Sequence, residues 1–173
     1  MTVTDLNTSE YHAFYETYIS KVPKDIDLIE GFKIGGEQLI SFFNQIPIDK
    51  LEYRYELGKW SIKEVLQHII DTERIFIYRC FRIARHDKTK LTGFEQDDYI
   101  EPSRAHSKSI ESLLEEYQVV RQNSIVLLKS LSEANLKYLG NASNTMLSAR
   151  AAAFMTLGHE IHHRHIVKER YLV

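Results

Sequence analysis

The sequence is poor in the residues that break helices and that form covalent cross-links: 173 residues contain one cysteine, three prolines and seven glycines. A single cysteine, Cys80, cannot form an internal disulfide, and its apolar helical surroundings predict a buried structural thiol. The scarcity of proline and glycine favours long uninterrupted helices over a fold built from strands and tight turns.

Long apolar runs and an excess of one charge are also missing. No stretch is apolar enough to cross a bilayer and residues 1–21 lack the apolar core of a secretory signal, so we expect a soluble cytoplasmic protein without a membrane partner. The net charge is −2, and without a basic excess we expect no nucleic-acid partner. The length suits one core, and residues 1–173 are interpreted as a single domain.

Apolar residues recur at helical spacing in four long segments. The second segment has the clearest start, because Ser61 and Glu64 form the S-x-x-E pattern of a capping box. Trp60 and Val65 occupy the two positions of a hydrophobic staple around that start. Gly35-Gly36, in the first segment, either weakens that helix or lets another helix approach. The predicted helices span about residues 25–44, 61–85, 107–131 and 148 to the C-terminal region.

The segments between these helices predict the topology. Residues 51–57 alternate apolar and polar side chains, but no partner strand is visible, so we interpret them as an extended connector. Residues 140–147 are interpreted as a loop, and the aromatic first twenty residues as a short helix or turn packed on the main body. Residues 86–106 form a far longer link than the roughly 2–8 residues that usually join antiparallel helices, so it can cross the bundle. The sequence therefore predicts an all-α four-helix bundle with a long crossover between helices 2 and 3.

The last predicted helix contains GHEIHHRH, in which His159, Glu160 and His163 satisfy the H-E-x-x-H zinc pattern of metalloproteases. His159 and His163 are four residues apart and share one helix face, so both imidazoles can bind one metal ion, with His162 as a competitor. A protease of this class usually draws its third ligand from after the motif. Only ten residues follow His163, and none is placed to return, so the protease is the least favoured hypothesis.

A better third ligand lies upstream. His68 falls within the apolar stripe of the second helix, where a lone histidine is more often a hydrogen-bonded core residue. Together with the pair on the last helix it forms a possible site between facing helices of a bundle. Three histidines would leave a coordination position open, as in catalytic zinc sites. Imidazole suits a divalent transition metal, with zinc or nickel as the favoured ions.

Three blocks of the sequence carry a resemblance to a known family: KWSIKEVLQHIIDTERIFIYRCFRIAR, GFEQDDY and GHEIHHRHIVKERYL. In these blocks the chain resembles the DinB/YfiT-like superfamily of bacterial metal-binding four-helix bundles. The resemblance implies an up-down-down-up bundle and a divalent metal at His68, His159 and His163. Members with known chemistry are transferases and isomerases that use low-molecular-weight thiols, so it also implies a thiol cosubstrate and a small-molecule substrate. The family commonly forms dimers, which makes a homodimer an expectation.

Several charged residues near the predicted ligands have both a functional and a structural interpretation. Glu64 or Asp71 could accept the second ring N–H of His68, although the capping box already explains Glu64. Glu160 could act as a general base, although a solvated helix face is the favoured interpretation. Three arginines could hold an anionic substrate or simply pair with nearby acids: Arg74, Arg79 and Arg82.

Three functional hypotheses follow. The favoured one is a metal-dependent enzyme with an open three-histidine site, either a thiol-dependent S-transferase or a hydrolase. The alternative is a non-enzymatic stress-response or binding protein, in which the metal ties helix 2 to helix 4. The H-E-x-x-H zinc protease is a distant third.

Overall fold

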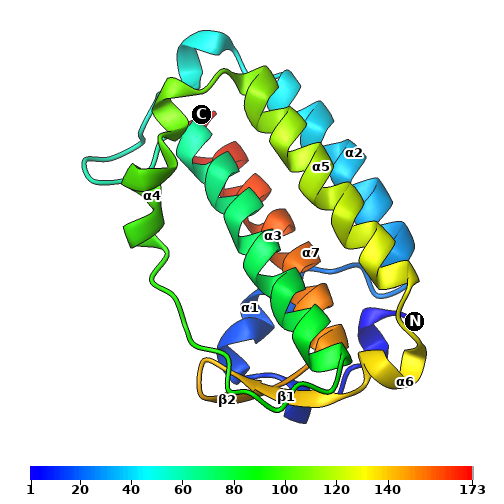
Figure 1. The fold of residues 1–173 in the computed structure, drawn as a ribbon. Coiled ribbons are helices and arrows are strands. Elements are labelled where there is room, and N and C mark those ends of the chain that lie inside the picture. The colour runs from blue at the N-terminus through cyan, green and yellow to red at the C-terminus, as the bar shows by residue number, and fades with distance from the viewer. Residues whose placement is uncertain (173) are drawn as a thin grey trace.

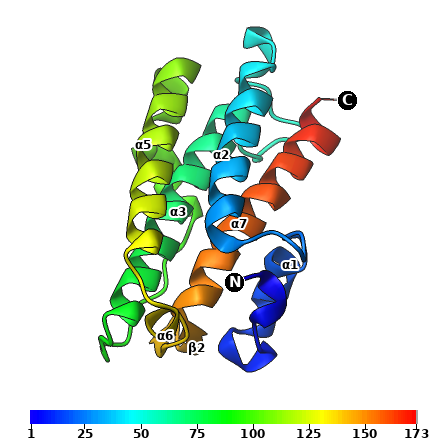
Figure 2. The same cartoon turned by 90° about the vertical axis from the view of Figure 1, so that its right-hand side faces the viewer.

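Four long helices form the body of the protein in the computed structural model, which describes residues 1–172 (Figure 1). Two views agree that the first and last of these helices run upward and the middle two downward (Figures 1 and 2). This is the predicted up-down-down-up order, with the middle two helices parallel to each other. The bounds are α2 (Leu28–Asn44), α3 (Ile62–Ala84), α5 (Ile110–Lys129) and α7 (Ala149–Ile166).

Each long helix begins at a side-chain cap. The predicted capping box of α3 is confirmed: Glu64 N donates to Ser61 Oγ at 3.3 Å, and Ser61 N donates to Glu64 Oε2 at 2.6 Å. Asp27, Ser109 and Ser148 cap the other three helices in the same manner. These caps satisfy backbone N–H groups that have no partner within the helix, and they therefore define where each helix starts. The observed starts lie within three residues of the predicted positions.

The crossover from α3 to α5 runs along the outside of the bundle (Figure 1). It contains two short helical turns that the sequence analysis did not predict, α4 (Asp97–Ser103) and η5 (Ala105–Ser107). Asp97 and Asp98 lie in the first turn of α4, where negative charge complements the helix dipole. The length of the connection therefore allows α5 to start at the same end of the bundle as α3.

A small hairpin follows α5 and the short α6 (Glu133–Leu136), so the prediction of a loop at 140–147 and of no sheet is wrong. β1 (Leu139–Ala142) pairs antiparallel with β2 (Thr145–Ser148). The two turn residues, Ser143 and Asn144, have φ of 52° and 60°, the left-handed backbone that a two-residue hairpin requires. Neither residue is glycine, so the sequence contained only a weak signal for a hairpin turn. The hairpin is fixed instead by its packing on α3.

The remaining segments are short. Residues 51–57 are a connector without a strand, as expected, but they form turns rather than an extended segment. The N-terminal residues pack on α7 as predicted, through α1 (Glu16–Ile19). The single-turn elements are η1 (Val3–Asp5), η2 (Thr8–Glu10), η3 (Ala13–Tyr15), η4 (Ile48–Lys50) and the π-helical η6 (Val167–Tyr171).

The core is divided into two apolar clusters with a polar layer between them. One cluster, around Phe32 and Phe154, lies toward the hairpin end, and the other, around Phe43 and Leu66, lies toward the opposite end. Cys80 belongs to the first cluster, where burial raises the pKa of its thiol to about 12, as expected of a structural cysteine. The polar layer contains Glu73, Arg121, Ser124 and Glu160 together with the three histidines of interest.

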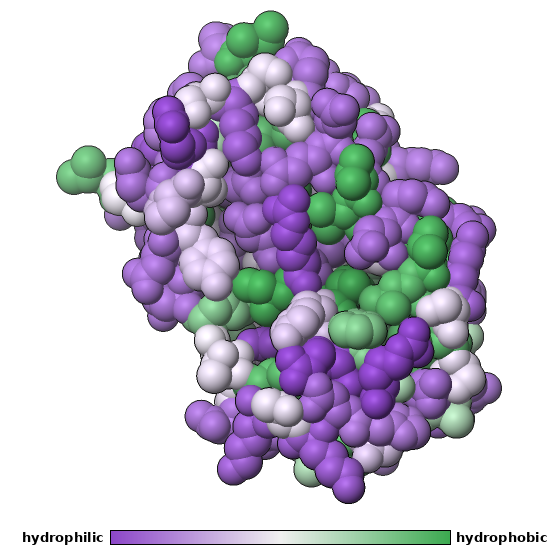
Figure 3. Space-filling model, viewed as in Figure 1, coloured by the Kyte–Doolittle hydropathy of each residue, from purple (hydrophilic) through white to green (hydrophobic). Residues whose placement is uncertain are grey.

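One outer face carries an apolar patch within a mostly hydrophilic surface (Figure 3). A groove of about 540 Å³ runs between α3 and α5, and Figure 3 shows hydrophobic side chains gathered over these helices. Its exposed apolar members include Tyr78, Phe81 and Val119. No helix within residues 1–172 is both long enough and apolar enough to cross a membrane.

We predict that Gly158→Ala destabilises the protein, because α1 crosses α7 directly above this residue. A Cβ at Gly158 would lie 2.1 Å from the backbone oxygen of Tyr18, so α1 would have to move. Such overpacking typically costs about 1–3 kcal/mol, more than the ~1 kcal/mol that alanine adds to helix propensity. Thermal unfolding followed by circular dichroism should show a lower Tm. Gly93→Ala is the control, because its Cβ would meet Ser143 Oγ at an ordinary 3.5 Å; an unchanged Tm for Gly158→Ala would contradict the packing.

Candidate metal centre

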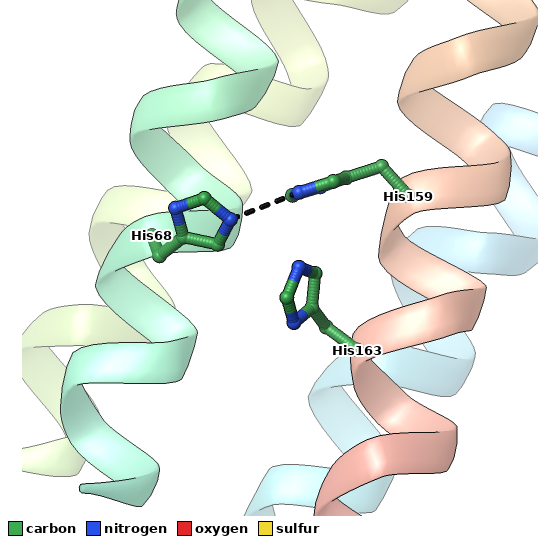
Figure 4. Close-up of side chains that lie close together, drawn as sticks. All are labelled: His68, His159 and His163. Atoms are coloured by element: carbon green, nitrogen blue, oxygen red, sulfur yellow. Dashed lines mark hydrogen bonds between the residues drawn. The ribbon is translucent and has the colours of Figure 1, made fainter. Parts of the chain in front are cut away.

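Three histidines meet in the space between α3 and α7 (Figure 4). His68 projects from α3, and His159 and His163 project from α7 one turn apart. The Nε2 atoms of His68 and His159 are 2.9 Å apart and share a hydrogen bond. The ligand atoms of all three residues lie within 4.8 Å of one another. The structure therefore brings together the three histidines that the sequence analysis selected.

The spacing of these nitrogens is close to that of a metal site. Nitrogens bound to one tetrahedral zinc at about 2.0–2.1 Å are separated by about 3.3–3.4 Å. The His68 and His159 Nε2 atoms are slightly closer than this, at 2.9 Å, and no pair of ligand atoms in the cluster is more than 4.8 Å apart. A set of three imidazoles is also a donor set that suits zinc and nickel. The residues present thus fit a divalent transition metal.

Burial keeps the histidines neutral, as metal ligands must be. Desolvation lowers the pKa of His68 from 6.5 to about 4. Desolvation also holds the pKa of His159 and of His163 well below the usual range, and the neighbouring histidines add to that effect. His68 and His159 are buried, whereas His163 remains partly exposed to solvent. The cluster therefore presents lone pairs at neutral pH without first losing protons.

Aromatic rings surround the cluster. The Trp60 ring lies 4.7 Å from the ring of His68, so this residue of the predicted staple also forms a wall of the site. Tyr18, from α1, lies 5.2 Å from His159, and Phe76 lies 5.9 Å from it. These rings limit the access of water to the imidazoles, which strengthens electrostatic interactions at the site.

The second nitrogen of His68 faces a residue that the sequence analysis did not select. Thr72 Oγ1 lies 3.5 Å from His68 Nδ1, one helical turn further along α3. Asp71 instead accepts from Gln67 and Arg74, and Glu64 accepts from Arg54 and from the Ser61 backbone. Within residues 1–172 no hydrogen bond joins either carboxylate to His68. The i, i+4 spacing of His68 and Thr72 on one helix could have identified this contact from the sequence.

Glu160 is 1% exposed, so the expectation of a solvated helix face is wrong. Its Oε2 accepts from Tyr117 Oη at 2.5 Å and from the Arg121 guanidinium of α5. Arg121 in turn donates to Glu73 of α3 at 2.7 Å. No hydrogen bond within the described chain connects Glu160 to the three histidines. The sequence analysis did not select Arg121 or Glu73. Each is a charged residue within an apolar helical stripe, and this pattern could have identified both.

The other residues that the sequence analysis considered lie outside the three-histidine cluster. His162 contacts the Tyr18 ring and lies outside the three-histidine group. Arg74 pairs with Asp71 and Glu116, and Arg82 pairs with Asp87, as their structural interpretation expects. Arg79 differs, because its hydrogen-bond partners are the uncharged oxygens of Thr92 and Ser143 rather than carboxylates.

Two cavities border the cluster, one at His163 and the other at His159. A cleft of about 510 Å³ is lined by His163, Trp60, Tyr55 and Arg170, among others. A smaller cavity of about 230 Å³ reaches His159 past Thr72 and Phe76. The crossover contributes to both, through Asp97 in the cleft and Gln96 in the cavity. Small molecules can therefore approach the histidines through either cavity.

We predict that the metal-free protein loses stability as pH falls below 6.5. The pKa of each cluster histidine is lower in the folded state, so the unfolded chain takes up protons first, and stability declines between pH 6.5 and the folded pKa. Each histidine contributes a slope of at most about 1.4 kcal/mol per pH unit. Urea unfolding at pH 7.5 and pH 5.0, in the presence of a chelator, measures the change.

The variants His68→Leu and His165→Ala separate the cluster from ordinary histidines. His68→Leu should reduce the pH dependence, whereas replacing the exposed His165 should leave it unchanged. Equal stability of the metal-free protein at both pH values would contradict the burial of neutral imidazoles.

Comparisons with known proteins agree with this architecture. The sequence matches the DinB superfamily over residues 32–167, and no curated protein matches it significantly. Among solved structures it resembles YfiT from Bacillus subtilis, described as a probable metal-dependent hydrolase with an unusual four-helix bundle topology. The two share 15% identity with a TM-score of 0.74 over 85% of this chain and 89% of that chain, which shows a common fold. The family match covers most of the sequence and includes all three histidines, so the chain belongs to the DinB superfamily.

Proposed function

We propose that this protein is a metal-dependent enzyme in which His68, His159 and His163 bind one divalent transition metal, zinc or nickel. The observation that carries the proposal is the convergence of three neutral imidazoles between two cavities that admit small molecules. Three protein ligands leave a position for a further ligand, as in catalytic zinc sites. A metal held there lowers the pKa of a coordinated water or thiol and so supplies a nucleophile at neutral pH.

The side chains around the cluster have defined tasks in this proposal. Thr72 Oγ1 would accept a hydrogen bond from the Nδ1–H of His68, which leaves the Nε2 lone pair free to bind the metal. Trp60 and Tyr18 hold back water, and the partly exposed His163 faces the cleft. Glu160 receives no proton-transfer step, because its Oε2 is bonded to Tyr117 and Arg121.

The reaction that we favour is transfer of a low-molecular-weight thiol to a small electrophilic substrate. Two separate cavities support a reaction of two organic molecules, with one approaching past His159 and the other past His163. Hydrolysis is the second candidate, and the structural similarity to YfiT, a probable metal-dependent hydrolase, supports it. In that case water would take the place of the thiol.

Two other hypotheses are less well supported. A purely structural metal would need a closed set of ligands, whereas the cluster offers three residues and adjoins two cavities. A zinc protease would use the glutamate of H-E-x-x-H as a base, but here Glu160 pairs with Arg121. The cytoplasmic location, the homodimer and the absence of a nucleic-acid partner stay predictions from the sequence.

We expect untagged protein to contain about one equivalent of a transition metal per chain, because the donor set fits a single ion. Elemental mass spectrometry after exchange into metal-free buffer measures the content. His68→Ala should lose the metal, since its Nε2 is the only donor from α3 in the cluster. His165→Ala, on the same helix as the other two ligands, is the matched control and should retain it. Equal metal content in His68→Ala and the wild type would contradict the site.

We expect the metal-loaded protein to accelerate conjugation of bacillithiol or mycothiol to a chromogenic electrophile such as 1-chloro-2,4-dinitrobenzene. The rate should fall to background in His159→Ala, and Glu160→Gln should retain activity if it remains folded, because this glutamate is not given a base role. Hydrolysis of 4-nitrophenyl acetate without thiol would instead favour the hydrolase. No reaction in either assay, together with a Tm that depends on metal, would favour the non-enzymatic alternative.

A further inference from the structure

Arg79 is a buried cation for which the described residues supply no counter-ion. The residue is 2% exposed, yet no carboxylate within residues 1–172 forms an ion pair with it. Its Nη2 donates to the backbone oxygen of Thr92 at 3.1 Å and to Ser143 Oγ at 2.9 Å. A charge taken out of water costs several kcal/mol unless a partner of opposite charge compensates it. The other buried arginines, Arg121 and Arg150, both have such partners.

Part of the Arg79 guanidinium has no hydrogen-bond partner in the described chain. Nε and Nη1 of Arg79 have no hydrogen-bond partner in the described chain. Neither atom is fully shielded from solvent. Ser143 Oγ accepts from Arg79, so the proton of this hydroxyl is free to donate elsewhere. The left-handed backbone of Ser143 at the hairpin turn fixes the position of that hydroxyl.

Ser143 lines the 230 Å³ cavity that reaches His159. Arg79 lies directly behind the same wall, with its guanidinium carbon 5.9 Å from the centre of the Phe76 ring and 5.7 Å from that of Phe94. The Phe76 ring is itself 5.9 Å from the His159 ring, so Phe76 separates the arginine from the histidine cluster. Arg79 therefore lies beside the part of the cavity that Ser143 lines, and His159 lines the same cavity.

Aromatic residues make up five of the ten residues that line the cavity. Its one carboxylate, Glu95, is exposed on the crossover. The volume is smaller than the 300 Å³ or so that begins the usual range of ligand pockets, so it suits a compact molecule. The aromatic residues are Phe14, Tyr15, Tyr18, Phe76 and Phe94.

We propose that Arg79 and Ser143 form an anion-binding end of this cavity, which selects a small carboxylate with a flat apolar body. The hydroxyl of Ser143 and the free edge of the guanidinium would hold the carboxylate, whose planar geometry matches the arginine fork. The apolar body would lie against the aromatic rings, and its other end would face His159. Only this last step rests on the proposed function, because binding of the anion itself requires no metal.

A purely structural role for Arg79 is the competing explanation. Its bonds to Thr92 and Ser143 tie the crossover and the hairpin to α3, and the crossover passes close to the hairpin in Figure 1. A residue that serves only as a tie would change stability when replaced, but it would not discriminate between a carboxylate and a neutral molecule of the same shape. Selectivity is therefore the property to measure.

The test titrates the protein with 4-fluorobenzoate and, separately, with neutral 4-fluorobenzamide, using ¹⁹F NMR to measure both affinities. We expect the carboxylate to bind the wild type at least about tenfold more tightly than the amide, as hydrogen bonds to charged groups imply. The preference should persist after a chelator removes any metal. It should disappear in Arg79→Met and partly remain in Arg79→Lys, which keeps the charge but loses the fork.

Several other outcomes would overturn the proposal. Equal affinities in the wild type, or an unchanged preference in Arg79→Met, would remove the anion site. A preference that vanishes with the metal would mean that the carboxylate binds the metal centre instead. If Arg79→Met fails to fold, Ser143→Gly removes the hydroxyl while tolerating the left-handed backbone, and it must weaken carboxylate binding more than amide binding. A preserved preference in protein that never binds metal would refute the proposed function but not the anion site.

Discussion

The buried guanidinium of Arg121 bonds to each of the other three long helices, and the arrangement of the bundle depends on it. From α5 it donates to Glu73 of α3, to Glu160 of α7 and, at 3.1 Å, to the backbone oxygen of Phe32 in α2. Sliding or rotating any of these helices would leave a buried charge or carbonyl without a partner, at a cost of several kcal/mol. Gly35 and Gly36 make this contact possible, because a Cβ at Gly36 would lie 3.2 Å from Arg121 Cγ.

The same network sets the orientation of the candidate metal centre. Glu160 lies between His159 and Ile161 on α7, so its side chain points in a different direction from those of His159 and His163. With Glu160 directed toward α5, the two histidines face α3 (Figure 4). On α3, Glu73 lies five residues after His68 and bonds to the same guanidinium. The glutamate of H-E-x-x-H thus belongs to the packing of this bundle, which explains how a protease-like pattern arises in a protein whose third histidine comes from another helix.

The segments outside the four helices complete the surroundings of the histidines. α1 brings Tyr18 against His159, the crossover places Gln96 and Asp97 in the two cavities, and the hairpin turn supplies Ser143. These contributions come from short helices and turns that precede or connect the long helices, and binding residues commonly lie on such segments of a rigid scaffold. The bundle therefore provides the candidate ligands, and its connections shape what can reach them.

Local patterns in the sequence determined the helices, because periodicity, the S-x-x-E box at Ser61 and the length of the crossover act over short distances along the chain. They also identified His68, His159 and His163, since helical spacing places such residues on predictable faces. Which groups meet across the bundle was decided only by tertiary structure: Arg121 beside Glu73 and Glu160, and Tyr18 beside His159. These contacts depend on the relative rotation and translation of distant helices, which burial and charge pairing fix together and which no single segment encodes.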